Sequence, residues 1–256
     1  MVPVAPLHPR RSARVRGASF TLAWLLLTHQ IRYTRDMSAY DYNPPDTPLD
    51  VVHVDDWLLV LNKPAGLLSV PGKGDHLADC LHARAALAYS GARLVHRLDR
   101  DTSGLIVFGR SHAAQVALNT LFSSRQVSKT YLALVGGNPA EDSGHIDLPI
   151  IVDWPNRPRQ MICHDTGRPS QTNWKVLRRW GDKTLMELTP LTGRSHQLRL
   201  HMLQIGHPIL GDTLYAPPEL ASATPRMCLH AAQLGFVHPS TGEAVSFTAP
   251  ADFVPK

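Results

Sequence analysis

A cluster of acidic and basic residues at positions 94–104 contains the side chains best suited to chemistry. Asp99 and Asp101 alternate with Arg97 and Arg100, directly before an apolar stretch that reads as a strand. A carboxylate at the edge of a sheet beside guanidinium groups is ionised at neutral pH, as a nucleophile requires. The cluster equally suits a solvated turn, because Gly, Ser and Thr surround the charges. The cluster alone leaves both interpretations open.

A second polar cluster, residues 191–201, opens a predicted helix. Arginine is permanently charged and can pair with a carboxylate through two hydrogen bonds, so we expect Arg194 to pair with Asp99. His196 and His201 are five residues apart and would lie about 140° apart around a helix, which makes a shared metal ion unlikely on geometric grounds. The alternative is a capped amphipathic helix whose polar side chains face water.

The elements that must position these clusters are mainly strands. Alternating or continuous apolar patterns predict strands at residues 50–54, 57–61, 104–109, 130–135, 171–177, 185–188, 229–237 and 244–247. Three helices are predicted, one capped by Asp75 and ending at Gly91, one capped by Ser111, and one from about Ser195 to Gly206. Residues 137–170 are expected to form a long excursion with short strands. Because strands outnumber helices and do not alternate strictly with them, the predicted class is α+β, with a mixed, largely antiparallel central sheet flanked by helices.

The net charge of +5 suggests a polyanion as partner, but the surplus is local. Residues 1–36 hold six arginines and one acidic residue, whereas residues 37–256 hold 20 basic and 20 acidic residues. A neutral domain has no global field that gathers nucleic acid. If the partner is nucleic acid, a local arrangement of charge must bind it.

The remaining composition is that of a globular protein, with 43% hydrophobic and 18% charged residues. Cys80, Cys163 and Cys228 are widely separated and form no C-x-x-C pair, which favours a reducing compartment and gives no zinc site. The apolar run at 18–27 is about half a membrane span and lacks a cleavage site, so we expect no membrane anchor. We interpret residues 1–36 as a disordered arm or as sequence upstream of a natural start at Met37.

Several short motifs follow one another in a characteristic order. They are NKPAG at 62–66, HRLD at 96–99 with TSG at 102–104, KTY at 129–131, and TGRSHQLR at 192–199. In order and approximate spacing they resemble the RluA family of RNA pseudouridine synthases. The resemblance covers nearly everything from about residue 40 onward. It implies the pseudouridine synthase fold and the isomerisation of uridine in RNA without a cofactor or metal. It also implies one catalytic domain, residues 37–256, without the S4-like RNA-binding domain of several relatives.

The resemblance also implies roles for individual residues. Asp99 would be the catalytic carboxylate, Tyr131 the tyrosine that packs against the target base, and Arg194 the cation that keeps Asp99 ionised. A uridine inside a stem or ordered loop is out of reach, so the enzyme must flip it out of its stack. Arg97 would occupy the space that the base leaves, and its neighbour His96 is assigned to substrate binding.

Three further residues are candidates for substrate contacts. Leu198 would contribute to the apolar wall of the pocket, with ordinary core packing as the alternative. Arg157 and Arg159 lie with Trp154 in a proline-restrained segment, a combination suited to phosphate contact and base stacking. Solvated surface arginines are the alternative for this pair.

Within the family, the resemblance is greatest to the compact dual-specificity member. This implies modification of the anticodon loop of certain tRNAs and of a hairpin uridine in 23S rRNA. We expect a cytoplasmic protein, and we expect a monomer because nothing in the sequence indicates an obligate partner. Two other functions stay open at this point. The chain could be a non-catalytic RNA-binding module of the same fold, or a hydrolase of a glycosidic bond with Asp101 as the second carboxylate that such enzymes require.

Overall fold

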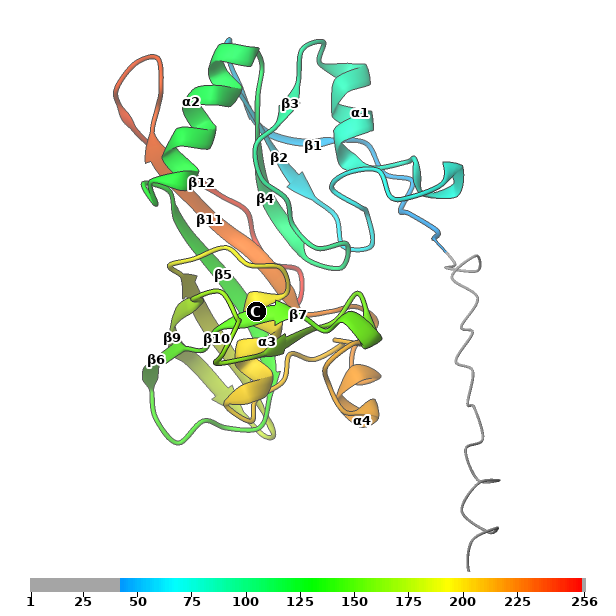
Figure 1. Cartoon of the computed structure of the whole chain (residues 1–256), viewed down its shortest axis with the longest axis vertical. Coiled ribbons are helices and arrows are strands. Elements are labelled where there is room, and N and C mark those ends of the chain that lie inside the picture. Colours follow the sequence, from blue (N-terminus) through cyan, green and yellow to red (C-terminus); the bar gives the residue numbers. More distant parts are fainter. Residues whose placement is uncertain (1–41, 255–256) are drawn as a thin grey trace, which may run out of the picture. The chain divides into compact units, whose positions relative to one another are not determined.

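The computed structural model describes residues 42–254, so the interpretation of residues 1–36 lies outside the described residues. Within this range the structure has twelve strands and four α-helices (Figure 1). The strands are β1 (Asp50–Val54), β2 (Leu58–Lys63), β3 (Arg93–Leu94), β4 (Ser103–Gly109), β5 (Ser128–Gly136), β6 (Ser143–Asp147), β7 (Ile150–Val152), β8 (Gln160–Ile162), β9 (Gln171–Trp180), β10 (Lys183–Pro190), β11 (Leu229–Val237) and β12 (Ala244–Thr248). The helices are α1 (Leu81–Ala88), α2 (His112–Ser123), α3 (Gln197–Gln204) and α4 (Pro218–Ala221).

One ten-stranded sheet dominates the described part of the chain. Its strands follow the order β1-β2-β4-β11-β5-β10-β9-β6, with β3 paired to β4 and β12 paired to β11. In this sheet β4 and β11 run parallel, while the other pairs are antiparallel. The predicted α+β class with a mixed, largely antiparallel sheet is therefore confirmed. Strands β7 and β8 form a separate two-stranded hairpin.

Helices cover both faces of the β2–β4 end of the sheet. Leu61 and Phe108 point to the face that packs on α1, whereas Val60 and Val107 point to the face that packs on α2. Because side chains alternate between the faces of a strand, burial of both faces requires a continuous apolar run. Residues 103–109 of β4 are all buried for this reason. Helix α3 packs on the other part of the sheet, where Met202 joins a cluster with residues of β5 and β10.

A close approach of two backbones sets the start of β4. Gly104 has φ 108°, and a Cβ atom there would lie 2.4 Å from the carbonyl oxygen of Ala231 on β11. Glycine tolerates this φ and leaves room for the neighbouring strand. The parallel pairing of β4 with β11 thereby fixes the point at which the loop carrying Asp99 enters the sheet.

The structure differs from the predicted elements in several places. Helix α1 begins at Leu81 because the sulfur of Cys80, and not Asp75, caps it, while Asp75 starts a separate 3-10 turn. Ser111 caps α2 as predicted. Helix α3 begins two residues later than expected, since His196 has a left-handed backbone. Part of the expected excursion, β6, belongs to the main sheet, and α4 was not predicted. None of the helices between residues 42 and 254 is long and apolar enough to cross a membrane.

Candidate active site

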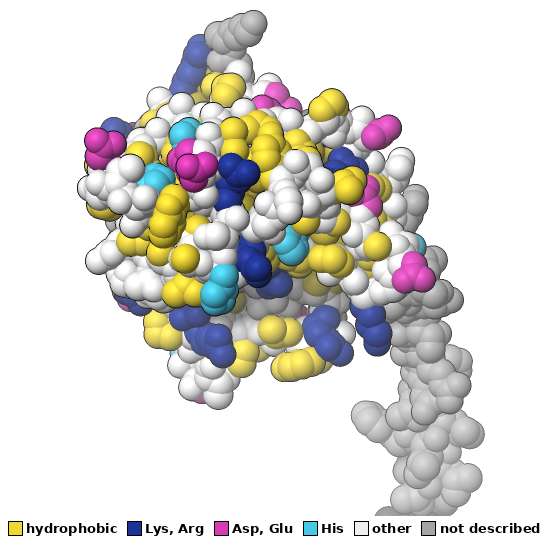
Figure 2. Space-filling model, turned by 90° about the horizontal axis from the view of Figure 1, so that it is seen from above, with side chains coloured by type: hydrophobic (Ala, Val, Ile, Leu, Met, Phe, Trp, Pro, Cys, Tyr) yellow, Lys and Arg dark blue, Asp and Glu magenta, His cyan; other side chains and the backbone are white. Residues whose placement is uncertain are grey.

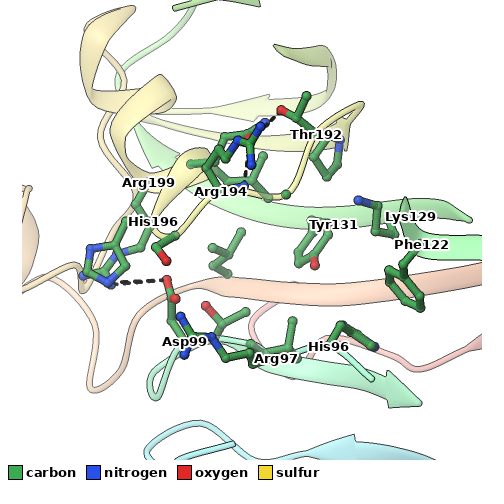
Figure 3. Close-up of a pocket in the computed structure, with 18 residues that line it drawn as sticks. His96, Arg97, Asp99, Phe122, Lys129, Tyr131, Thr192, Arg194, His196 and Arg199 are labelled. Carbon is green, nitrogen blue, oxygen red and sulfur yellow. Dashed lines mark hydrogen bonds and ion pairs between the residues drawn. The ribbon is translucent and has the colours of Figure 1, made fainter. Parts of the chain in front are cut away.

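Both polar clusters of the sequence line one cavity of about 310 Å³. The loop before β4 forms one wall, and the loop leading into α3 forms the opposite wall (Figure 3). Between them, β5 and the end of α2 supply the floor and the far end. The predicted site residues that line this cavity are His96, Arg97, Asp99, Tyr131, Arg194 and Leu198.

The loop that carries Asp99 is fastened to residues 63–69 by buried hydrogen bonds. The Lys63 ammonium donates to the carbonyl oxygens of Pro64, Leu67 and Arg100, at 2.7–2.9 Å. The Ser69 hydroxyl donates to the Leu98 carbonyl and accepts from the Leu98 amide, at 2.7 and 3.1 Å. Lys63 of the NKPAG motif and Ser69, which follows the motif, therefore hold the backbone on both sides of Asp99. The lysine of the motif thus has a structural role in fixing the loop that carries Asp99.

Arg199, and not Arg194, lies against Asp99. Its Nη1 is 3.5 Å from Asp99 Oδ2, and the rest of its guanidinium pairs with Asp212 at 2.6 and 2.8 Å. The Arg199 side chain is 3% exposed, so its charge is buried between the two carboxylates. A buried, oriented guanidinium stabilises an anion beside it far more than an exposed one does. The expected Asp99–Arg194 pair is wrong, because residue 194 precedes the helix, whereas Arg199 lies in its first turn.

Arg194 stays at the exposed edge of the cavity. The Gln197 side chain fixes its backbone by accepting hydrogen bonds from the Arg194 amide and the Thr192 hydroxyl. Gln197 in turn donates to the Gln171 carbonyl on β9. No ion pair joins Arg194 to a carboxylate of the described residues. Its charge is thus available to a ligand that enters the cavity.

Tyr131 projects from β5 into the middle of the cavity, between the two walls (Figure 3). Burial and the negative charge of Asp99 raise the pKa of its hydroxyl. The phenol therefore keeps its proton at neutral pH and presents a flat ring with a hydrogen-bond donor at its edge. A planar base could stack on or beside such a ring.

A neutral histidine and a lysine form the other end of the cavity. His96 stacks on Phe122 with ring centroids 4.5 Å apart, and its Nε2 accepts a hydrogen bond from the Val107 amide. Burial, and to a lesser degree the charge of Lys129, lower the pKa of His96 to about 3. Burial also lowers the pKa of Lys129. His96 thus joins this wall to β4 as an uncharged side chain.

The remaining predicted contacts divide into two groups. Arg97 is an exposed lining residue, and Leu198 is a buried one. Arg157 and Arg159 do not line the cavity and belong instead to the β7–β8 hairpin. The Arg157 guanidinium lies 4.4 Å from the ring centroid of Trp154, which is 65% exposed. Leu200, two residues after Leu198, packs in a separate cluster with Ile150.

Asp99 is the one acidic side chain among the described residues that line the cavity. Asp101 pairs with Arg100 at 2.7 Å and points elsewhere. A hydrolase of the usual kind would need a second carboxylate in the cavity, so this geometry counts against that alternative. The described residues contain no group of three His, Cys, Asp or Glu side chains arranged to hold a metal ion. Sequence reasoning missed Arg199 and Lys63, although a charged residue within an apolar stretch signals a buried partner.

Comparison with solved structures defines the class of protein. Human RNA pseudouridylate synthase domain containing 1 superposes with a TM-score of 0.70 at 30% identity, covering 83% of this chain and 88% of that chain. Human RNA pseudouridylate synthase domain containing 4 gives 0.64 at 26% identity, covering 80% and 89%. The fold is therefore that of the pseudouridine synthases. The family model for RNA pseudouridylate synthase matches residues 57–204, which include both walls of the cavity.

Sequence relatives narrow the class further. The dual-specificity RNA pseudouridine synthase RluA of Pasteurella multocida is 51% identical over 219 residues, which are 85% of this chain and the whole relative. The protein of the same name from Escherichia coli K12 is 48% identical over the same share of each chain. The chain belongs to the RluA family of RNA pseudouridine synthases. It is an isomerase with an RNA substrate, and the non-catalytic alternative is not supported.

Proposed function

We propose that the cavity receives a uridine flipped out of an RNA and that Asp99 is the carboxylate that acts on it. The observation that carries this proposal is the isolation of Asp99, the one acid lining the cavity, with Arg199 3.5 Å away. Tyr131, whose hydroxyl keeps its proton, offers the ring against which the base packs. The fixed cation and the fixed loop reduce reorganisation when charge moves during the reaction.

Replacing Asp99 with Asn should abolish pseudouridine formation and leave RNA binding largely intact. The carboxylate supplies the reactive oxygen, whereas the amide has nearly the same shape and makes similar contacts. The matched control is Asp101→Asn, because Asp101 lies two residues away but pairs with Arg100 outside the cavity. Single-turnover assays and filter binding measure the two properties. Substantial activity in Asp99→Asn, with loss in Asp101→Asn, would transfer the role to Asp101.

Arg97, Arg157 and Arg159 are proposed to bind the RNA around the flipped base. Arg97 lies exposed at the cavity edge, next to Asp99 in the chain, and suits the space that the base leaves. Arg157 and Arg159 belong to the hairpin and suit phosphates or neighbouring bases. His96 and Leu198 are proposed to shape the pocket walls for the base, and Arg194 to contribute charge at its rim.

The substrates are proposed to be the anticodon loop of tRNA and a hairpin of 23S rRNA. Support comes from the relatives at 48–51% identity, whose name includes dual specificity. Pseudouridine mapping by carbodiimide-dependent reverse-transcription stops, in RNA from cells with and without the gene, tests this. Loss of one tRNA site together with one 23S site is expected, while unchanged maps would overturn the substrate proposal.

The catalytic unit is proposed to be residues 37–256, acting as a monomer in the cytoplasm. The 219 residues that match the relatives equal the relatives' whole length, which supports a single catalytic domain. Light scattering of the purified protein measures the oligomeric state directly.

A further inference from the structure

His196 has a backbone conformation that few residues other than glycine adopt. It precedes α3 with φ 56° and ψ 15°, the left-handed region, and its side chain does not cap the helix. Among the described residues, one other non-glycine residue, Arg125, has a positive φ. Glycine or asparagine would adopt this conformation with less strain, so a histidine here suggests a use for its ring.

Tyr215 and Asp99 together favour one tautomer of His196. The Tyr215 hydroxyl accepts a hydrogen bond from the Gln160 amide at 2.7 Å and lies 2.8 Å from His196 Nδ1. A phenol has one proton, which is free to go to Nδ1 because the amide supplies its own. The same oxygen has a second lone pair for an Nδ1–H, but only the tautomer with Nδ1 as acceptor and the proton on Nε2 turns a donor, and not a lone pair, toward the Asp99 carboxylate. We infer that this is the tautomer of His196. Burial lowers the pKa of His196, which keeps the ring neutral.

The protonated nitrogen faces Asp99. His196 Nε2 is 4.0 Å from Asp99 Oδ2, the same oxygen that lies 3.5 Å from Arg199 Nη1 (Figure 3). This distance is longer than a hydrogen bond, but hydrogen bonds of catalytic groups often shorten when the substrate binds. Both donors approach Oδ2, and no hydrogen bond from the described residues reaches Oδ1. The arrangement leaves Oδ1 as the oxygen that meets the substrate.

We propose that His196 is a positioning residue for Asp99, with its Nε2–H directed at Oδ2 by the hydrogen bond from Tyr215. Arg199 supplies charge to Oδ2, and His196 supplies a second donor from another direction, so the carboxylate cannot rotate freely. This inference rests on the proposed function, because it gives His196 a part in a site whose carboxylate is Asp99. The alternative is that residue 196 serves the backbone turn alone.

Replacing His196 with glutamine or with asparagine distinguishes the positioning role from the backbone role. The terminal NH₂ of glutamine can reach the position of Nε2, whereas that of asparagine reaches only the position of Nδ1. Asparagine, however, fits the left-handed backbone better than glutamine. A positioning role therefore predicts that His196→Gln is the more active variant, while a backbone role predicts that His196→Asn is at least as active and as stable.

Steady-state kinetics with the RNA identified by mapping provide the test. His196→Asn should lower kcat roughly 10- to 100-fold with KM changed by less than about twofold, as expected for one lost hydrogen bond to a charged group. His196→Gln should stay within about tenfold of the wild type. Equal kcat values for the two variants, or a change confined to KM, would contradict the proposal.

Tyr215→Phe tests the same arrangement without changing the backbone of residue 196. It removes the hydroxyl that fixes the tautomer and should lower kcat roughly tenfold, with Tm recorded for each variant. Tyr89→Phe is the matched control, because Tyr89 is half-buried against the core cluster beside α1 and does not line the cavity. A wild-type kcat for Tyr215→Phe would overturn the proposal. Asp99→Asn, assayed in parallel, shows separately whether the proposed function itself fails.

Discussion

The loop that carries Asp99 and the hairpin that carries Arg157 and Arg159 are built in opposite ways. The loop is held by hydrogen bonds from the buried side chains of Lys63 and Ser69. It continues directly into β4, whose residues are all buried. The hairpin is a two-stranded sheet of its own, and Trp154 near its tip is 65% exposed. Loops with many buried contacts hold a fixed geometry, whereas the exposed tip of a hairpin can adapt even where its base is anchored, as Ile150 anchors this one.

This difference separates the two tasks of an RNA-modifying enzyme. Chemistry requires reacting groups to be held within a fraction of an ångström, so a rigid loop should determine kcat. Recognition of a charged, deformable polymer tolerates adjustment, so an exposed hairpin should determine KM. The domain has no net charge to assist binding, because residues 37–256 hold 20 basic and 20 acidic residues. On the face drawn in Figure 2, the Lys and Arg side chains lie mainly in the centre and lower part, and the acidic side chains lie mainly above and at the sides. Variants in each region therefore test whether kcat and KM are controlled separately.

The largest effect in the comparison is expected at Arg199. Arg199→Lys keeps a positive charge but cannot pair with Asp212 and reach Asp99 at once, so kcat should fall about 100-fold. Arg194→Lys should leave kcat within about threefold, because Arg194 is exposed and does not contact Asp99. Separate determination of kcat and KM checks both. A larger loss of kcat at Arg194 than at Arg199 would reverse the assignment made from the geometry.

The buried amine of Lys63 should make the stability of the protein depend on pH. Burial lowers its pKa to about 7, from 10.5 for an exposed lysine. Below pH 7 the amine is charged in the folded and the unfolded states, so the cost of burying the charge is fully present. Between about pH 7 and 10.5 the folded protein has lost the proton that the unfolded chain retains, and the cost declines.

The free energy of unfolding of the wild type, relative to Lys63→Met, should therefore increase by a few kcal/mol across this interval. Urea unfolding at a series of pH values measures it. Lys73→Met is the control, because Lys73 is exposed. The difference in free energy of unfolding between this variant and the wild type should not change with pH. A flat difference for Lys63→Met as well would mean that the amine is solvated, contrary to its position.

The sequence allowed prediction of the local features but not of the contacts that fix the loop. The Ser111 cap is recognisable because it depends on neighbours within a few residues, whereas the roles given to Asp99 and Arg97 come from the family resemblance. Lys63 and the Arg100 carbonyl are 37 residues apart, and Arg199 and Asp99 are 100 apart. Such pairs depend on strand order and register, which local patterns do not specify. The same limit applies to Arg194 and Arg199, because both arginines lie in one motif and the local pattern does not specify which of them reaches Asp99.

The hairpin should affect binding and not chemistry. Arg157→Ala should raise KM a few-fold with kcat unchanged, and should reduce the salt dependence of binding by about one counterion. Arg159→Ala should raise KM similarly, although its guanidinium also lies 5.2 Å from the Tyr215 ring. The matched control is Arg178→Ala, because Arg178 is also exposed and lies 5.3 Å from the Trp180 ring, away from the cavity. A fall in kcat for Arg157→Ala would show that the two tasks are not separate.

The smallest effect is expected from removing residues 1–36, which hold the whole surplus of positive charge. If the fixed loop and the hairpin supply the RNA contacts, KM and kcat of the shortened protein should stay within about twofold of the full chain, and the salt dependence should be unchanged. Six arginines that contacted phosphates would instead lower affinity by orders of magnitude when deleted, and most strongly at low salt. Titration of both proteins against the mapped RNA at several salt concentrations decides between these outcomes. A steep loss of affinity would make the N-terminal segment a third RNA-binding region beside the loop and the hairpin.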